Sequence, residues 1–120
     1  MNYTIRQAAE KFGLEPPTLR YYEKEGILSP RKTETGIRIY SEEDMDQLEM
    51  VCCLKATGMS IKDIRRYFDL CAQGDSTVEE RLEIFNQQRL HILKQIETLQ
   101  KNLAKIDCKI AWYKGKHHIK

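Results

Sequence analysis

The sequence predicts an all-α protein with a small β-hairpin wing, in which a winged helix-turn-helix is followed by a long C-terminal coiled-coil helix for dimerisation. Two features of the 120 residues lead to this prediction. Hydroxyl residues followed three positions later by an acid or Gln, the arrangement that satisfies free amides at a helix start, occur four times. Beyond residue 76, apolar residues recur every three or four positions to nearly the end of the chain, as in a coiled coil.

Composition limits the chain to one modest core. With 41% hydrophobic and 32% charged residues, we expect a compact domain at 1–75, a dimerisation helix at 76–114 and a flexible tail at 115–120. The start of the chain lacks the pattern of a targeting segment, and no run of about 18 apolar residues occurs, so we expect a cytoplasmic protein without membrane contact. Four cysteines without a paired spacing indicate reduced thiols.

The charge is unevenly distributed along the chain. The net charge is +2, with seven Lys and Arg against five acids in residues 1–40, four against eight in 41–75, and nine against five in 76–120. A net charge this small does not by itself indicate nucleic-acid binding. Any contact with DNA therefore depends on individually placed side chains.

Two short helices open the chain. Thr4 and Gln7 are spaced as a capping box for the first helix, which Gly13 ends. The second helix is entered through Pro16 and Pro17, because proline is tolerated in a first turn, where its missing N–H leaves nothing unsatisfied. The inward sides of the two helices comprise Ile5, Ala8, Ala9, Phe12, Leu19 and Tyr22. This arrangement is typical of a helix-turn-helix.

Between Gly26 and Tyr40 the pattern changes from helical to strand-like. The apolar pair at 27–28 is followed by Pro30, a polar turn at 33–36, and apolar and basic residues alternating at 37–40. An apolar segment, a glycine-containing polar turn and an alternating segment in this order predict a small hairpin, which we interpret as a wing.

Two further helices follow the wing. The first spans roughly 42–56 and ends at Gly58, and the second ends at Gly74. The predicted caps pair Ser41 with Asp44 and Ser60 with Asp63. The apolar faces comprise Met45, Leu48 and Cys52 in the first helix and Ile61, Ile64, Phe68 and Cys71 in the second.

The last helix is expected to be long and to pair with another helix. Its predicted cap is Ser76 or Thr77, with Glu79 or Glu80 completing the capping box. The apolar seam, interrupted only by Arg89, comprises Leu82, Phe85, Ile92, Ile96, Leu99, Leu103, Ile106, Ile110 and Tyr113. A stripe of this length is more than a lone helix buries, and a 3.5-residue period winds two helices around each other. We expect a homodimer, with packing of the helix on its own domain as the alternative.

Four segments carry a resemblance to a known family. Residues 4–14, 18–28, 31–40 and 54–64 are similar, in order and spacing, to the DNA-binding domain of MerR-type transcription regulators. The most characteristic stretch is Thr18-Leu19-Arg20-Tyr21-Tyr22-Glu23. The resemblance covers nearly the whole chain and implies an antiparallel homodimer that binds promoter DNA.

The resemblance also implies which residues contact DNA. The second helix would enter the major groove, where Arg20 reaches bases or phosphates and the ring of Tyr21 packs on sugar. The wing would hold flanking phosphates, and the helix start at Ser60 would bind another. Pro17 stands where some relatives carry a basic, groove-facing side chain. The complete expected set is Thr4, Pro17, Thr18, Arg20, Tyr21, Arg31, Lys32, Ile37, Arg38, Tyr40, Ser60 and Lys62. For Tyr22 we expect a core position instead.

MerR-type dimers act on promoters in which the two elements read by RNA polymerase lie too far apart. The resemblance implies that the protein twists or kinks this DNA when a signal arrives, against an elastic cost of a few kcal/mol in smooth-bending estimates. The expected partners are double-stranded promoter DNA, RNA polymerase and a second copy of the chain. No cofactor is expected.

Several inducing signals are compatible with the sequence. Metal-sensing relatives carry cysteines at the start of the long helix and in a loop beyond it, and this chain lacks that loop, so we expect no metal site. Cys53 points away from the apolar face of its helix and matches the single cysteine of a short branch that answers aldehydes, other electrophiles or thiol stress. The resemblance to that branch extends to residues 74–79. Cys53 is therefore the candidate sensor; an unreactive Cys53, with a metal ion or a non-covalent ligand as the signal, is the alternative.

Two other classes of protein remain for comparison. An enzyme is not expected, because the sequence has no glycine-rich phosphate loop and no recognisable pair of catalytic carboxylates. A coiled-coil interaction module that happens to contain a helix-turn-helix is the other alternative. Operator-specific binding that weakens steeply with salt would separate a regulator from such a module.

Overall fold

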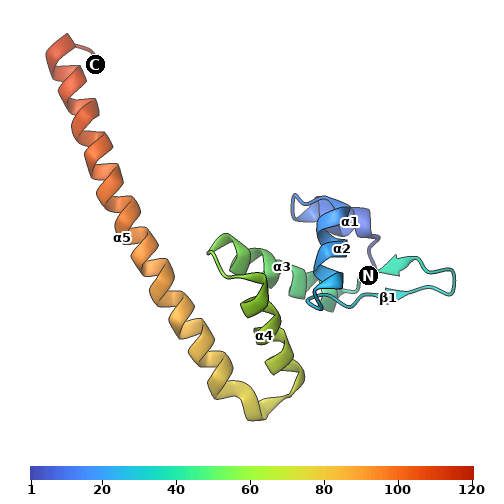
Figure 1. Ribbon diagram of the computed structural model, residues 1–120. Helices are drawn as coiled ribbons and strands as arrows, with labels where there is room; N and C mark the ends of the chain where they lie inside the picture. Colours follow the sequence, from blue (N-terminus) through green and yellow to red (C-terminus); the bar gives the residue numbers. More distant parts are fainter. The chain divides into compact units, whose positions relative to one another are not determined.

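The computed structural model describes all of residues 1–120. Its elements, in order, are α1 (Ile5–Lys11), α2 (Pro16–Lys24), β1 (Arg31–Lys32), β2 (Arg38–Ile39), α3 (Glu42–Ala56), α4 (Ile61–Ala72), the 3₁₀ helix η1 (Asp75–Thr77) and α5 (Val78–His117) (Figure 1). The predicted class, all-α with a small hairpin and a long last helix, is confirmed. The chain forms two compact units, Met1–Leu82 and Glu83–Lys120. None of its helices combines the length and apolar composition needed to cross a bilayer.

Most of the predicted helix starts form as expected. The Thr4 hydroxyl oxygen accepts from the Gln7 amide at 3.1 Å, and the Gln7 side chain accepts from the Thr4 amide at 2.9 Å. Ser41 and Asp44 make the same reciprocal pair at the start of α3. Ser60 caps α4 by accepting from the amide of Asp63. Local sequence therefore determines where these helices begin.

The predicted cap of α5 is wrong. Residues Asp75–Thr77 form a 3₁₀ turn instead, and the hydroxyl oxygen of Thr77 lies 2.6 Å from the carbonyl oxygen of Leu70 and 2.9 Å from that of Gly74. Thr77 is buried, so its side chain closes the turn between α4 and α5 rather than capping α5. The Nε of Arg81, one turn further along α5, donates to the same hydroxyl at 3.0 Å.

The core of the first unit joins the helix-turn-helix to α3 and α4. α1 contacts α2, and α3 contacts α4. Tyr22 is buried, as predicted. The largest fully buried side chains are Leu19, Ile27, Tyr40, Met45, Leu48, Val51 and Ile64. Within this face of α3, Cys52 is only half-buried.

The wing is a two-stranded antiparallel hairpin. Arg31 pairs with Ile39 and Lys32 with Arg38. At its tip the Gly36 amide donates to the Thr33 carbonyl at 2.9 Å, and Gly36 has φ +84°, a left-handed conformation that side chains disfavour. The predicted turn at 33–36 is therefore confirmed. At the base of the wing, Tyr40 exchanges both backbone hydrogen bonds with Tyr3, at 2.8 Å each.

The long helix α5 runs continuously from Val78 to His117 (Figure 1). Three residues of the predicted flexible tail, 115–117, are therefore helical, because the helix continues through Gly115. No residue of α5 is buried. The exposed side chains on the predicted seam are Leu82, Ile96, Leu99, Leu103, Ile106, Ile110 and Tyr113. Ile92, also on the seam, is half-buried.

Candidate nucleic-acid interface

The outer side of α2 carries the side chains expected to meet DNA. Pro17, Arg20 and Tyr21 are exposed, and Thr18 is half-buried. The ring of Tyr21 is 47% exposed, while that of its neighbour Tyr22, 6.0 Å away between centroids, is buried. One tyrosine of the pair thus anchors α2 to the core, and the other is available to a ligand together with Arg20. An exposed cation and phenol on a two-turn helix suit a groove-binding element.

The start of α1 contributes Thr4. Its side chain is exposed, and its hydroxyl oxygen accepts the Gln7 amide as part of the capping box. Because a hydroxyl has one proton to donate and two lone pairs, Thr4 retains its donor for a further partner. A contact between Thr4 and a phosphate is therefore compatible with its structural role.

The first strand of the wing presents cations to solvent. Arg31 and Lys32 are exposed, and Ile37 at the tip is 61% exposed. Exposed Arg and Lys side chains of this kind can donate hydrogen bonds to the phosphate oxygens of a DNA backbone. The predicted placement of these three residues on the protein surface is confirmed.

The second strand of the wing differs from the prediction. Tyr40 is fully buried, and its hydroxyl donates to Glu23 Oε1 at 2.8 Å. Burial, followed by this hydrogen bond, raises the pKa of Tyr40. The expected phosphate contact by Tyr40 is therefore wrong, because its hydroxyl faces the interior.

Arg38 is likewise engaged within the protein. Its Nε lies 2.6 Å from Glu23 Oε2 and 2.9 Å from Glu23 Oε1, and the side chains of Arg38 and Glu23 are only 28% and 14% exposed. The Glu23 carboxylate pairs with the guanidinium at Nε, so Arg38 takes part in an ion pair within the protein. This pairing was not expected from the sequence, and a phosphate contact by Arg38 stays a prediction.

The start of α4 offers a third surface. Ser60 and Lys62 are exposed, with Ser60 accepting from the Asp63 amide at 3.1 Å. Arg66 lies one helical turn beyond Lys62 and is also exposed. Sequence reasoning missed Arg66, although its i,i+4 spacing from Lys62 was a usable signal. Together these residues place two cations along one side of α4.

Glu23 is the other residue that sequence reasoning missed. It lies on α2, and its partners Arg38 and Tyr40 come from the end of the wing. No local pattern pairs residues 15 and 17 positions apart. Only the folded chain brings the carboxylate to the wing.

The four thiols occupy different environments. Cys53 on α3 and Cys108 on α5 are exposed, whereas Cys52 and Cys71 are half-buried. Burial raises the pKa of Cys52, and the charge of Glu49 adds to this effect. The wheel-based expectation that Cys53 points away from the core is confirmed by its exposure. Nowhere in the chain do three His, Cys, Asp or Glu side chains gather closely enough to hold a metal ion.

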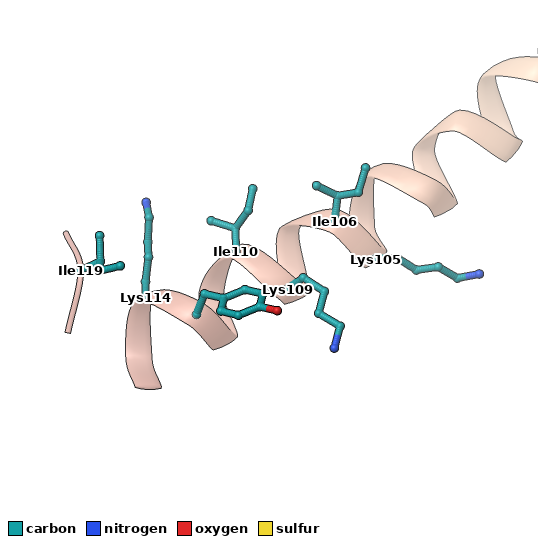
Figure 2. A pocket seen from close by; sticks show the side chains of 7 residues that line it. Lys105, Ile106, Lys109, Ile110, Lys114 and Ile119 are labelled. Carbon is teal, nitrogen blue, oxygen red and sulfur yellow. The ribbon is translucent and has the colours of Figure 1, made fainter. Parts of the chain in front are cut away.

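The far end of α5 has an apolar groove of its own. Figure 2 shows Ile106 and Ile110 projecting from the same side of the helix, with Ile119 beyond them. Lys105, Lys109 and Lys114 line the groove as well. This end of α5 thus exposes an apolar stripe that is edged by lysine side chains.

A helix-turn-helix with an exposed basic helix, a cationic wing and a further basic helix start defines the chain as a winged helix-turn-helix DNA-binding protein. Residues 3–71 match the family model described as MerR HTH family regulatory protein, and residues 45–108 match the one described as MerR, DNA binding. The chain belongs to the MerR family of transcription regulators. It is a sequence-specific DNA-binding regulator and not an enzyme.

Several relatives are similar over most of the chain. An HTH-type transcriptional regulator of Haemophilus influenzae is 42% identical over 114 residues, covering 94% of this chain and 84% of that protein. The regulator AdhR of Bacillus subtilis is 40% identical over 91 residues, covering 75% of this chain and 65% of AdhR.

Solved structures agree with the fold. The crystal structure of HiNmlR, described as a MerR family regulator lacking the sensor domain and bound to promoter DNA, has a TM-score of 0.90 and 40% identity, covering 99% of this chain and 95% of that one. A MerR family regulator from Bacillus thuringiensis has a TM-score of 0.85 and 43% identity, covering 94% of this chain and all of that one.

Proposed function

We propose that the protein acts in the cytoplasm as a homodimer that binds promoters with overlong spacing between the two elements read by RNA polymerase. In response to aldehyde, electrophile or thiol stress, the dimer twists or kinks this DNA so that polymerase can use it. The similarity to HiNmlR supports the promoter-binding part of this proposal, because that regulator is described as bound to promoter DNA. The two chains match over 99% and 95% of their lengths.

Dimerisation through α5 is supported by its uncovered seam. Leu99 and Leu103, in the middle of the helix, are 66% and 57% exposed in the single chain. Burying apolar side chains of this size stabilises an interface by about 1.5–3 kcal/mol each when burial is complete. The proposed dimerisation residues are Ile92, Ile96, Leu99, Leu103, Ile106 and Ile110. A helix with so long an apolar stripe gains stability by pairing.

An antiparallel arrangement is supported by charge. Residues 76–97 carry three Lys and Arg against four acids, whereas residues 98–120 carry six Lys against one Asp. A parallel pair would place the two lysine-rich ends side by side. An antiparallel pair brings each lysine-rich end to the more acidic half of its partner, which lowers the repulsion.

DNA contacts are proposed for the exposed members of the predicted set and for Thr18, which is half-buried. These residues are Thr4, Pro17, Thr18, Arg20, Tyr21, Arg31, Lys32, Ile37, Ser60 and Lys62. Arg20 and Tyr21 would read or track the major groove from α2, and Arg31 and Lys32 would fix the flanking backbone from the wing. Contacts on both sides of the groove helix are what a protein needs in order to hold a deformed duplex.

Cys53 is the proposed sensor because it combines exposure with a place on the DNA-binding unit. The exposed thiol of Cys108 lies on α5 instead, and Cys52 is half-buried with a raised pKa. The thiolate of Cys53 would attack an aldehyde carbonyl carbon, forming a C–S bond while the carbonyl oxygen takes up the proton that the thiol lost. A hemithioacetal at this position adds bulk and polarity to the outer side of α3. Target genes that remove aldehydes, such as dehydrogenases, would suit this chemistry.

The proposal is tested by transcription in vitro from the promoter upstream of the gene, with purified protein, polymerase, and formaldehyde, methylglyoxal or diamide. We compare the wild type with Cys53→Ser and with Cys108→Ser, which removes the other exposed thiol as a matched control. The proposal predicts induction by electrophile in the wild type and in Cys108→Ser, and loss of induction but not of operator binding in Cys53→Ser. Equal induction by electrophile in all three proteins would contradict the assignment of Cys53 and place the reactive group elsewhere. No induction by electrophile in any of them would favour a metal ion or a non-covalent ligand as the signal.

A further inference from the structure

The wing is too small to hold its own orientation. Each strand has two residues, β1 at Arg31–Lys32 and β2 at Arg38–Ile39. An isolated two-stranded hairpin is marginally stable at best in water. The backbone pair of Tyr40 with Tyr3 ties the base of the wing to the N-terminal segment. A side-chain anchor on α2 would in addition set the distance between the wing cations and the groove helix.

Glu23 of α2 is placed to supply that anchor. Its carboxylate holds Arg38 Nε at 2.6 Å and the Tyr40 hydroxyl at 2.8 Å. Residues 38 and 40 are two apart along an extended segment, so their side chains project to the same side and reach one carboxylate together. We call Glu23, Arg38 and Tyr40 the wing clamp.

The wing clamp lies next to cations that are proposed to contact DNA, on both α2 and the wing. Glu23 lies one helical turn from Arg20 on α2. Arg38 is the cross-strand partner of Lys32. The clamp is largely shielded from water, with the Glu23 side chain 14% exposed, so its charge-assisted hydrogen bonds are stronger than those of a surface ion pair.

We propose that Glu23 is a positioning residue for DNA binding, which fixes the wing cations Arg31 and Lys32 relative to the groove helix. This inference rests on the wing contacts of the proposed function. It predicts the opposite direction of change in DNA affinity from the one that the charge of Glu23 alone would give. Glu23 is an acid in a DNA-binding surface, so simple electrostatics predicts that removing its charge strengthens binding, whereas positioning predicts that binding weakens.

The test measures operator affinity and its salt dependence for Glu23→Gln. The matched control is Glu25→Gln, which removes the same charge two residues further along, where the side chain is half-buried. We expect Glu23→Gln to weaken operator binding by roughly tenfold or more, and the slope of log K against log salt to become shallower as wing phosphate contacts are lost. Glu25→Gln is expected to bind at least as tightly as the wild type. Partial unfolding alone would lower the active fraction without changing the slope.

A double-mutant cycle separates this inference from the proposed wing contacts. Arg31→Ala with Lys32→Ala should weaken binding in the wild type but add little in the Glu23→Gln background, because the contacts are already lost there. If the wing substitutions weaken binding equally in both backgrounds, or if Glu23→Gln binds like Glu25→Gln, the positioning role is overturned while the wing contacts stand. If the wing substitutions have no effect in the wild type, the wing contacts themselves are refuted, and the positioning role with them.

Discussion

Arg81 Nη1 lies 4.0 Å from the Sγ of Cys71, across the turn that joins α4 to α5. The same guanidinium donates to the Thr77 hydroxyl at 3.0 Å and to the Gly74 carbonyl oxygen at 3.1 Å. Burial, followed by a hydrogen bond with Cys71, raises the pKa of the nearby Tyr67. One side chain of α5 thus holds together the segment through which the DNA-binding unit continues into the long helix.

Arg81→Ala is expected to destabilise this turn. It removes charge-assisted hydrogen bonds to a buried hydroxyl and to a backbone carbonyl, so we expect the free energy of unfolding to fall by about 1–3 kcal/mol. Chemical denaturation followed by circular dichroism measures this change. Lys94→Ala, an exposed cation on the same helix, is the control and should leave stability within about 0.5 kcal/mol. Equal effects of the two substitutions would show that Arg81 does not hold the turn.

Tyr40→Phe is expected to change the pH dependence of stability. The pKa of Tyr40 is raised above its ordinary value of 10.0 in the folded protein. Its contribution is therefore fully present below pH 10 and is lost as the pH rises through the folded-state pKa. Without the hydroxyl, the variant should be less stable at pH 7, by about 1–3 kcal/mol for a lost hydrogen bond to a charged group, and should lose less stability between neutral and alkaline pH.

Denaturation midpoints across the alkaline range measure the effect of Tyr40→Phe. Tyr21→Phe serves as the control, since the Tyr21 side chain is exposed. An alkaline loss of stability as steep in Tyr40→Phe as in the wild type would contradict the assignment to Tyr40.

Substitutions on the groove helix and the wing should separate two kinds of DNA contact. Lys32→Ala is expected to weaken binding to operator and to random DNA alike. The slope of log K against log salt concentration should become shallower by about one for the phosphate contact that is lost. Arg20→Ala should cost more on operator than on random DNA, by about 1–3 kcal/mol if it reads a base. Fluorescence anisotropy with operator and with random DNA, at several salt concentrations, distinguishes the phosphate contact from the base contact. A uniform loss for Arg20→Ala on both DNAs would restrict Arg20 to a phosphate contact.

Charged residues on the α5 seam should abolish the dimer. Ile96→Asp with Leu103→Asp places charges in the proposed interface, and we expect monomers that bind operator poorly because the two half-sites are no longer held together. Analytical ultracentrifugation measures the mass. Thr98→Asp, also exposed on α5 but off the seam, should remain dimeric. A dimer that survives the double substitution would place the interface elsewhere.

Sequence alone predicts the helices well because their signals are local. The capping boxes at Thr4 and Ser41 form as the sequence indicates, and α3 spans Glu42–Ala56, the range its pattern predicts. Helix caps and apolar periodicity involve residues that are close in the sequence. The helices that they predict therefore do not depend on which distant residues become neighbours in the folded protein. The same holds for the exposure of Cys53 on α3.

The sequence does not predict the features that depend on long-range packing. The pairing of Tyr40 and Arg38 with the Glu23 carboxylate arises only when the fold brings α2 to the wing. Thr77 resembles a helix cap, but burial against the end of α4 converts it into the hydrogen-bonding centre of a turn. Partners that become neighbours only through tertiary structure leave no periodic signal in the chain.

Activation by deformation of the promoter depends on the length of the spacer between the two polymerase elements, and varying this spacer tests it. Transcription in vitro is measured with the natural spacer and with spacers shortened stepwise, with and without the electrophile-treated protein. We expect strong activation on the natural promoter. Once the spacer reaches the length that polymerase prefers, we expect high transcription without the protein and no further activation by it. Equal activation at every spacer length would contradict this expectation, because recruitment of polymerase without any change in DNA geometry would then suffice.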